Sequence, residues 1–304
     1  MIKADIIARE FNFRIEGDKN KIIIAPGNLR SNDESHIFWL KSIEYAGNFQ
    51  NGTLVITEEH FEQIQKLENV CYLITEFSAR LMFSKVVNMY FNDLGLRLTL
   101  NQVEYHRLNK KIVIADNVYI SEDVTIGNGT IIYPNVVIHN DTIIGSNCIV
   151  KSNCTIGTEG LGYTKEENQW IQFPQIGGVR IAENVIMGPS VTIRRGALDN
   201  TIIEKGVKIG SFTNIGHNCV IGENSILTCQ CVTGGSTILG KNVYMGISAV
   251  TKNAINVGDD AVIGAGAVVV KNIAKAITVV GNPAENIKEF EKWSKKKKNL
   301  LARH

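Results

Sequence analysis

Residues 115–156 read ADNVYI-SEDVTI-GNGTII-YPNVVI-HNDTII-GSNCIV-KSNCTI, a series of hexapeptides that each end in Ile or Val. With the residue before the series, the repeated positions are Ile114, Ile120, Ile126, Ile132, Ile138, Ile144, Val150 and Ile156. An α-helix repeats about every 3.6 residues and a strand every second residue, so neither gives this period. A period of about six is typical of a solenoid in which each hexapeptide forms one flat side and three sides close a coil.

The period returns twice in the second half of the chain, each time in a new phase. A short run contains Ile181, Met187 and Ile193. Ten of twelve positions are apolar in the long run, which consists of Ile203, Ile209, Ile215, Ile221, Leu227, Thr233, Leu239, Met245, Thr251, Val257, Ile263 and Val269. Gly, Asn and Asp often follow these positions, and they tolerate the positive φ of tight corners. The sequence therefore predicts a mainly β fold, a parallel β-helix over residues 111–282 with roughly eight coils stacked about 4.8 Å apart.

Residues 157–179 interrupt the period and carry charges, Tyr163, Trp170 and Pro174 at no fixed phase. We expect this insert to form a loop or hairpin that projects from one corner of the solenoid. Loops on a rigid scaffold often carry function, but a solenoid can also simply tolerate an insertion. The residues leave both interpretations open.

The two ends of the chain lack the period, and we expect them to fold separately. Residues 1–94 predict a small α/β domain, and residues 95–110 predict a connector. The elements expected in this domain are strands at Asn51–Thr57 and Val70–Thr75 and helices at Glu59–Leu67 and Ser78–Phe91. Residues 283–304 predict a basic C-terminal helix that begins at Pro283.

Composition restricts the classes of function. The chain has 32 Lys and Arg against 30 Asp and Glu, and a net charge of +2 gives no strong case for nucleic-acid binding. No apolar stretch approaches the roughly 18 residues of a membrane span. The N-terminal MIKADIIAREFNF also lacks the apolar core of a signal peptide. We therefore expect a cytoplasmic protein.

The cysteines fit a reducing cytoplasm as well. They stand at positions 71, 148, 154, 219, 229 and 231, without the paired spacing of a metal site. Four fall at interior phases of the coils, where Cys acts as a small hydrophobic residue. Cys229 and Cys231 could form a redox or metal pair, but thiols stacked in the core are the favoured interpretation.

Two of the six histidines lie in the periodic segments, in the pairs His139-Asn140 and His217-Asn218. His217 follows an Ile-Gly pair, which places it at a corner and directs it away from the core. A corner imidazole can act as a general base, because histidine takes up a proton near neutral pH, or it can make a turn hydrogen bond. His139 has a similar local sequence, so the residues alone do not choose between the two. A metal-dependent hydratase would need more converging histidines than these two.

Three stretches closely resemble one family of enzymes. They are GLGYTKEENQWIQFPQIGGVRI at 160–181, RRGALDNTIIEKGVKIG at 194–210 and NIGHNCVIGENSILTCQCVTGGSTILGKNVYMG at 214–246. Together with HIFWLKSIEY at 36–45, they are similar to the UDP-3-O-acylglucosamine N-acyltransferases of lipid A synthesis, within the hexapeptide-repeat acyltransferases. The resemblance implies a left-handed β-helix and a homotrimer with active sites between adjacent prisms.

The resemblance also implies roles for particular residues. His217, paired with Asn218, would be the general base for the sugar amine, and the N–H of Gly235 would hold the oxyanion. The acyl group would come from acyl-coenzyme A or acyl-carrier protein as co-substrate, with no permanently bound cofactor and no metal.

The same resemblance implies a nucleotide site in the N-terminal domain. Trp39 and Tyr45 match an aromatic pair that sandwiches uracil, and Ser42 stands between them where the family usually has Asn.

Three other positions depart from the family pattern. Gly210 stands where the family has an acid seven residues before the catalytic histidine, Arg194 replaces an Asp, and Ala254 replaces a second histidine. The C-terminal VIGAGAVVVKNIAKAITVVGNPAENI resembles coenzyme A-dependent acyltransferases of nucleotide-linked amino sugars.

These observations favour an N-acyltransferase that acts on a nucleotide-linked amino sugar for a bacterial surface glycan. The lipid A enzyme itself and a non-catalytic scaffold that binds nucleotide sugars are the alternatives.

Overall fold

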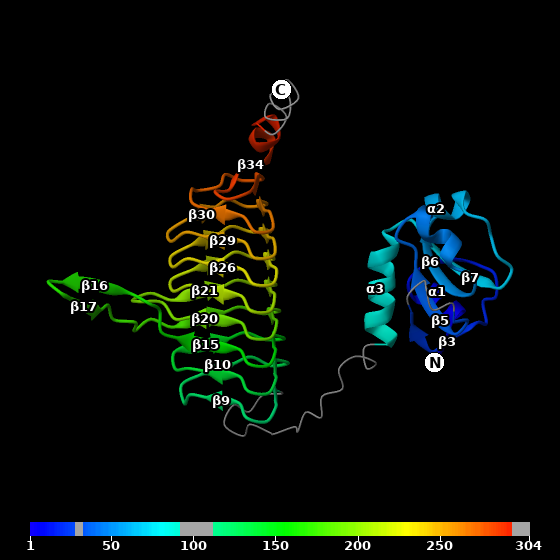
Figure 1. Cartoon of the computed structure of the whole chain (residues 1–304). Helices are drawn as coiled ribbons and strands as arrows, with labels where there is room; N and C mark the ends of the chain where they lie inside the picture. The colour runs from blue at the N-terminus through cyan, green and yellow to red at the C-terminus, as the bar shows by residue number, and fades with distance from the viewer. Residues whose placement is uncertain (28–32, 92–111, 294–304) are drawn as a thin grey trace. The chain divides into compact units, whose positions relative to one another are not determined.

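The computed structural model describes residues 1–27, 33–91 and 112–293. The chain divides into two compact units, Met1–Thr99 and Leu100–His304 (Figure 1). The connector expected at 95–110 lies outside the described residues. Each unit has hydrophobic clusters of its own.

The first unit is built on a five-stranded sheet with the order β2-β7-β6-β5-β4. Strands β4 to β7 run parallel, and β2 pairs antiparallel with β7. The bounds are β2 Arg14–Glu16, β4 Ala25–Pro26, β5 His36–Trp39, β6 Gly52–Thr57 and β7 Val70–Thr75, with a separate pair of β1 Ile2–Lys3 and β3 Ile22–Ile23. The central strands β6 and β7 are buried along almost their whole length, because both of their faces are covered.

Helices cover both faces of this sheet. On one face, residues of α1 Ala4–Glu10 and α3 Ala79–Tyr90 pack in one cluster with Ile37 of β5. On the other face, residues of α2 Glu58–Gln63 and the 3-10 helix η1 Ile43–Asn48 pack with Phe38. Neighbouring residues of β5 thus serve opposite faces, as strand geometry requires.

Helix α2 ends at Gln63, four residues before the expected end at Leu67. Ile64 has extended backbone angles, φ −100° and ψ 154°. The N–H of Leu67 donates to the Tyr72 hydroxyl at 2.8 Å, and both Ile64 and Leu67 pack on the cluster around Phe38. Packing on the sheet therefore outweighs local helix propensity in this segment.

The second unit is a left-handed parallel β-helix whose three sides are stacks of very short strands (Figure 1). The eight-stranded side contains β9 Tyr119–Ile120, β12 Val137–Ile138, β15 Thr155–Thr158, β20 Thr192–Arg194, β23 Asn214–Ile215, β26 Val232–Thr233, β29 Val250–Thr251 and β32 Val268–Val269. The seven-stranded side contains β10 Thr125–Ile126, β13 Thr142–Ile144, β18 Val179–Ile181, β21 Thr201–Ile203, β24 Val220–Ile221, β27 Ile238–Leu239 and β30 Asn256–Val257. The ten-stranded side contains β8 Val113–Ile114, β11 Ile131–Ile132, β14 Ile149–Val150, β19 Ile186–Met187, β22 Lys208–Ile209, β25 Ile226–Leu227, β28 Tyr244–Met245, β31 Val262–Ile263, β33 Thr278–Val280 and β34 Glu285–Asn286.

The repeated positions of all three runs line the interior, which confirms the fold class predicted from the period. Each of them is at most 4% exposed, except Ile120, which is partly buried against the same cluster. The two polar members of the long run are also satisfied inside. The Thr233 hydroxyl accepts from the Gly216 N–H at 3.1 Å, and the Thr251 hydroxyl lies 3.0 Å from that of Thr237.

The insert forms an antiparallel hairpin that projects from the β-helix (Figure 1). Its strands are β16 Tyr163–Glu166 and β17 Gln169–Gln172, and the coils resume at β18. An isolated two-stranded hairpin is only marginally stable in water, so the contacts at its root matter for its position.

The C-terminal end differs from the expected helix 283–304. Strand β34 pairs antiparallel with β33, and the N–H of Ala284 donates to the Val268 carbonyl at 2.7 Å. Residues after Pro283 therefore cover the last coil with main-chain hydrogen bonds. The helix begins only at residue 287 and is described to residue 293. Residues 294–304 lie outside the described part of the chain. Of the helices that the structure describes, none has the length and apolar character of a membrane span.

Five of the six thiols are buried, and only Cys229 is exposed. Burial raises the pKa of the Cys71 thiol to about 12 and that of Cys154 to about 11. The same desolvation raises the pKa values of Cys148, Cys219 and Cys231. Cys229 and Cys231 thus lie in different environments, one in solvent and one in the core.

We predict that a thiol reagent labels one cysteine of the native protein. The thiolate is the reactive form, and a raised pKa keeps the five buried thiols protonated and out of reach near neutral pH. Mass spectrometry after brief labelling should find the adduct on Cys229 alone, and Cys229→Ser should remove it. Labelling of Cys231 at a similar rate would contradict this core, and denaturant should release all six thiols as the control.

Candidate functional site

One corner of the β-helix, between the eight-stranded and seven-stranded sides, carries most of the candidate residues. We call it the insert corner, and it comprises residues 139–141, 159–178, 195–200, 216–218, 234–236 and 252–254 of successive coils. His217 and Asn218 follow β23 at this corner, and Gly235 follows β26 in the next coil. The fold therefore brings His217, Asn218, Gly235 and the insert to one edge of the prism.

The His217 imidazole is held in a defined orientation by Asn218. The Oδ1 atom of Asn218 accepts a hydrogen bond from the Ala197 N–H at 2.9 Å and lies 2.9 Å from Nδ1 of His217. An amide nitrogen could not accept from a backbone N–H, so the Ala197 contact fixes which end of Asn218 is oxygen. Nδ1 of His217 must then donate, which leaves the lone pair on Nε2.

Two glycines leave room for the half-buried imidazole. A Cβ atom at Gly235 would lie 2.5 Å from Nε2 of His217, and one at Gly160 would lie 2.8 Å from its Cδ2. Gly160 belongs to the root of the insert, so the insert itself forms part of the wall around the imidazole. Among the described residues, no group accepts a hydrogen bond from the Gly235 N–H. Gly235 is thus placed beside Nε2 with a free donor.

His139 does not occupy the equivalent position, although its local sequence resembles that of His217. The register of the eight-stranded side aligns Ile138 with Ile215, so His139 corresponds to Gly216 and Asn140 corresponds to His217. No hydrogen bond of its ring is found within the described residues. Nor does any group of three or more His, Cys, Asp or Glu in the described parts of the chain form a potential metal site.

The positions that depart from the family pattern have distinct surroundings. Gly210 precedes β23 and His217 follows it, so the two lie at opposite ends of one strand and at different corners. A Cβ at Gly210 would lie 2.6 Å from the Cys229 backbone nitrogen, which leaves no room for a side chain. Position 210 therefore cannot orient the imidazole of its own chain. Ala254 lies at the insert corner in the coil after Gly235, and its N–H donates to the Gly235 carbonyl at 2.9 Å.

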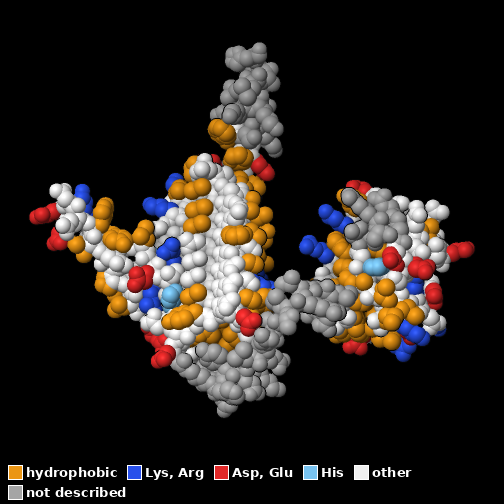
Figure 2. All heavy atoms as spheres, turned by 60° about the horizontal axis from the view of Figure 1, so that its bottom comes forward, with side chains coloured by type: hydrophobic (Ala, Val, Ile, Leu, Met, Phe, Trp, Pro, Cys, Tyr) orange, Lys and Arg blue, Asp and Glu red, His pale blue; other side chains and the backbone are white. Residues whose placement is uncertain are grey.

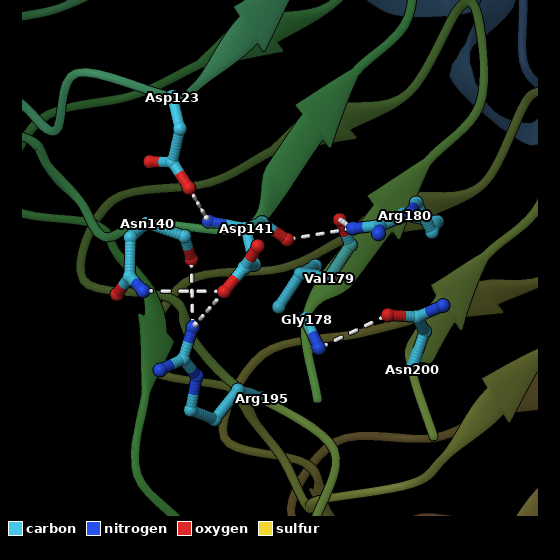
Figure 3. A network of polar contacts seen from close by, with 8 residues as sticks. All are labelled: Asp123, Asn140, Asp141, Gly178, Val179, Arg180, Arg195 and Asn200. Carbon is cyan, nitrogen blue, oxygen red and sulfur yellow. Dashed lines mark hydrogen bonds and ion pairs between the residues drawn. The ribbon is translucent and has the colours of Figure 1, made fainter. Parts of the chain in front are cut away.

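Two arginines at the end of β20 hold the root of the insert. Nη1 of Arg194 donates to the Glu159 carbonyl at 2.7 Å, where the insert begins. Arg195 is 8% exposed, and its Nη2 donates to the Asn140 carbonyl at 2.7 Å and lies 3.6 Å from the Asp141 carboxylate (Figure 3). The guanidinium groups thus tie the corner of β20 to the insert and to an earlier coil.

The other end of the insert is anchored in the same network (Figure 3). The Gly178 N–H donates to Oδ1 of Asn200 at 3.0 Å, and Arg180 donates to the Asp141 carbonyl at 2.6 Å. The Asp141 N–H donates to the Asp123 carboxylate at 2.9 Å. Both ends of the insert are therefore fixed to the solenoid, which positions Gly160 against His217.

The predicted nucleotide residues all lie in the first unit. Trp39 ends β5 and packs, partly buried, on the cluster that includes α1 and α3. Ser42 is the N-cap of η1 without a side-chain cap, and Tyr45 is 42% exposed within η1. Their sandwich around a base stays a prediction.

Exposed apolar side chains gather at the insert corner. Leu161, Ile176 and Leu198 are 79%, 69% and 61% exposed, and Leu161 and Ile176 belong to the insert. Figure 2 shows hydrophobic side chains on the outer faces of the β-helix and along the projecting hairpin as well. The period could not predict the roles of Gly160, Gln175 and the Ala197 N–H, because none of them stands at a repeated position.

Comparison with known proteins supports the same family as the sequence motifs. The family described as bacterial transferase hexapeptide (six repeats) matches residues 123–158 and 200–235. The UDP-3-O-acylglucosamine N-acyltransferase 1 of Sulfurimonas denitrificans is 38% identical over 143 residues, which are 46% of this chain and 44% of the relative. The UDP-3-O-acylglucosamine N-acyltransferase of Campylobacter lari is 40% identical over 142 residues, with the same 46% and 44% coverage.

A solved structure, UDP-N-acetylglucosamine acyltransferase from Campylobacter jejuni, is 20% identical, with a TM-score of 0.49 over 57% of this chain and 73% of that one. The chain spans less than half the length of the two curated relatives. The relatives confirm the resemblance to UDP-3-O-acylglucosamine N-acyltransferases that the sequence motifs predict.

We predict that Gly235→Ala removes most activity without unfolding the protein. The backbone of Gly235 does not have the positive φ that would exclude alanine, whereas the new Cβ would lie 2.5 Å from Nε2 of His217. A displacement of about 1 Å at the reacting group can cost about 100-fold in rate. Acyl-transfer assays check this, and Gly47→Ala is the control because a Cβ there meets nothing within 4 Å. A fully active, folded Gly235→Ala variant would contradict the placement of the imidazole.

Asn218 has a φ of 58°, which glycine adopts without strain, so glycine is the substitution that removes the side chain with the least effect on the backbone. Asn218→Gly should lower kcat by about 10–100-fold, because the imidazole loses the acceptor that selects its tautomer. Asn218→Asp keeps an oxygen at that place and should retain much more activity. Asn224→Gly, at another corner with φ of 57°, controls for the backbone effect. Equal rates for the Asn218→Gly and Asn224→Gly variants would show that the Asn218 contact with the His217 imidazole does not matter for activity.

Proposed function

We propose that this protein transfers an acyl group from a thioester to the amine of a nucleotide-linked amino sugar, with His217 as the general base. The observation that carries the proposal is the orientation of the imidazole. Asn218 Oδ1 accepts a hydrogen bond from the Nδ1–H group at 2.9 Å, and Nε2 lies beside Gly235 with its lone pair available. A base in this state can accept a proton from an attacking amine.

The proposed step uses only this chain's residues and the two substrates. The amine nitrogen attacks the thioester carbonyl carbon while Nε2 of His217 removes a proton from that nitrogen. The Gly235 N–H donates to the resulting oxyanion. When the intermediate collapses, the C–S bond breaks, and the leaving thiolate takes the proton from the imidazolium. An amide and a free thiol result, so neither a covalent enzyme intermediate nor an external oxidant or reductant is needed.

The names of the curated relatives favour UDP-3-O-acylglucosamine as the acceptor. Trp39 and Tyr45 would stack on its uracil, since aromatic side chains bind planar bases through their faces. Ser42, with no cap hydrogen bond of its own, would be free to reach the base. A different nucleotide-linked amino sugar is the second candidate, which the replacement of Asn by Ser at position 42 favours.

Several further features belong to the same proposal. The donor would be acyl-carrier protein or acyl-coenzyme A, and the exposed Leu161, Ile176 and Leu198 at the insert corner suit an apolar acyl chain. A homotrimer would set the insert corner of one copy against a neighbouring copy. The reaction would take place in the cytoplasm, where activated nucleotide sugars and acyl thioesters are available.

His217→Ala should lower kcat by about 10²–10⁴-fold, the usual contribution of a general base. The assay offers UDP-3-O-acylglucosamine and a panel of other nucleotide-linked amino sugars, each with acyl-carrier protein and acyl-coenzyme A donors, and detects products by mass spectrometry. His139→Ala is the matched control, because this second histidine of the same side lies outside the proposed site. Unchanged turnover of His217→Ala would refute the mechanism, and nucleotide-sugar binding without any transfer would favour the scaffold alternative.

A further inference from the structure

Gln175 is an unexplained polar residue at the root of the insert. Its side chain is 7% exposed, and its Oε1 atom is buried with no hydrogen-bond partner in the described parts of the chain. A buried acceptor without a donor destabilises the folded state, because it loses its hydrogen bond to water and gains none in return. Such an atom in a folded protein therefore calls for a functional explanation.

The orientation of this amide follows from its other end. Nε2 of Gln175 donates to the Phe173 carbonyl at 3.4 Å, so rotation of the amide would set two carbonyl-type oxygens against each other. Oε1 therefore points away from Phe173, toward the backbone of Gly160.

Gly160 brings this oxygen next to the imidazole. A Cβ atom at Gly160 would lie 2.6 Å from Oε1 of Gln175 and 2.8 Å from Cδ2 of His217. Both groups thus border the same small space, which only a glycine leaves open. The Gln175 oxygen lies across this space from the Cδ2 and Cβ atoms of His217, whereas the Asn218 oxygen contacts Nδ1.

The charges around this corner make such an oxygen useful. At this corner the coil before His217 carries Arg194, Arg195 and Asp199, and residues 234–236 of the next coil have no ionisable side chain. The insert carries Glu159 at its root and Lys165, Glu166 and Glu167 in its hairpin. Nη1 of Arg194 donates to the Glu159 carbonyl, and the Glu159 carboxylate accepts from Gln172 at 3.2 Å. Arg195 lies 3.6 Å from the Asp141 carboxylate, and no carboxylate among the described residues is bonded to His217. An imidazolium formed there would therefore have no bonded carboxylate to offset its charge.

We propose that Gln175 is a positioning residue whose side-chain carbonyl stabilises the protonated form of His217. Imidazolium C–H edges carry positive charge, and a carbonyl dipole aimed at them acts strongly in a site of low polarity. Together with Asn218 Oδ1, this oxygen takes the place of the acid that position 210 cannot supply. The inference rests on the proposed function in one respect, namely that His217 gains a proton during the reaction.

The test compares Gln175→Leu, which removes the dipole, with Gln175→Glu, which adds a negative charge. NMR titration of the His217 imidazole in the ligand-free protein is the first measurement and needs no activity. We expect the titration midpoint to rise by about one pH unit in Gln175→Glu and to fall by several tenths of a unit in Gln175→Leu. The acid limb of the pH profile of kcat/KM should move to higher pH in Gln175→Glu and to lower pH in Gln175→Leu. In Gln175→Leu, kcat should also be about tenfold lower.

Gln172→Leu is the matched control, because Gln172 lies in the same insert, is exposed and contacts Glu159 instead. Wild-type titration of His217 in both Gln175 variants would overturn the inference, even if the rates fell, because a purely structural role would produce that result. If Gln175→Leu does not fold, Gln175→Glu alone decides by the same titration. If the Gln175 variants shift the titration of His217 but the wild-type protein transfers no acyl group, the Gln175 contact would be upheld and the proposed acyl transfer would be refuted.

Discussion

Contact between the backbones of successive coils at the corners is the constraint on which the rest of this structure depends. A Cβ at Gly127 would lie 2.4 Å from the Ser146 nitrogen, and one at Gly222 would lie 2.3 Å from the Gly240 carbonyl oxygen. Corners this close admit no side chain at these positions. The residue two places later adopts a left-handed backbone, as at Asn147 and Asn224. The spacing of six is therefore set by the corners as much as by the interior.

The candidate site is a consequence of departures from this rule at a single corner. Between Ile156 and Ile181 the insert leaves the solenoid, and between Ile193 and Ile203 the corner is longer than the regular hexapeptide. Both breaks lie at the insert corner, in the two coils that precede the coil carrying His217. The longer corner supplies the Ala197 N–H that orients Asn218. Tightly stacked coils on either side keep these groups in place, because local shifts would disrupt the main-chain ladder.

The sequence could predict the interior because each buried position follows from one simple period. Ile126, Ile221 and Ile263 face inward for the same reason, and one phase predicts them all. It also predicted that His217 lies at a corner. It could not predict which histidine has an oriented ring, because that depends on contacts across coils. Asn218 and Ala197 are 21 residues apart, and such a contact leaves no local pattern.

Other parts were less predictable for reasons of packing. The early end of α2 results from contacts with β7, the strand that follows it. Strand β34 forms because its backbone pairs with β33 at the end of the solenoid. The family pattern places an acid at position 210, seven residues before its catalytic histidine. In the fold, β23 separates that position from His217, so spacing in sequence was a poor guide to distance there.

An amide oxygen and a carboxylate affect an imidazole differently, and the difference suits the chemistry proposed here. A carboxylate partner favours the imidazolium strongly, but it must itself be desolvated and balanced in a corner that already contains Arg195 and Asp141. An amide oxygen fixes the tautomer at a smaller desolvation cost and adds no charge beside the imidazole. Its weaker support of the cation is tolerable when the leaving group is a thiolate, which departs without full protonation. The Asn218 oxygen therefore supplies orientation, and the remaining demand is a modest stabilisation of positive charge, which a second neutral acceptor can meet.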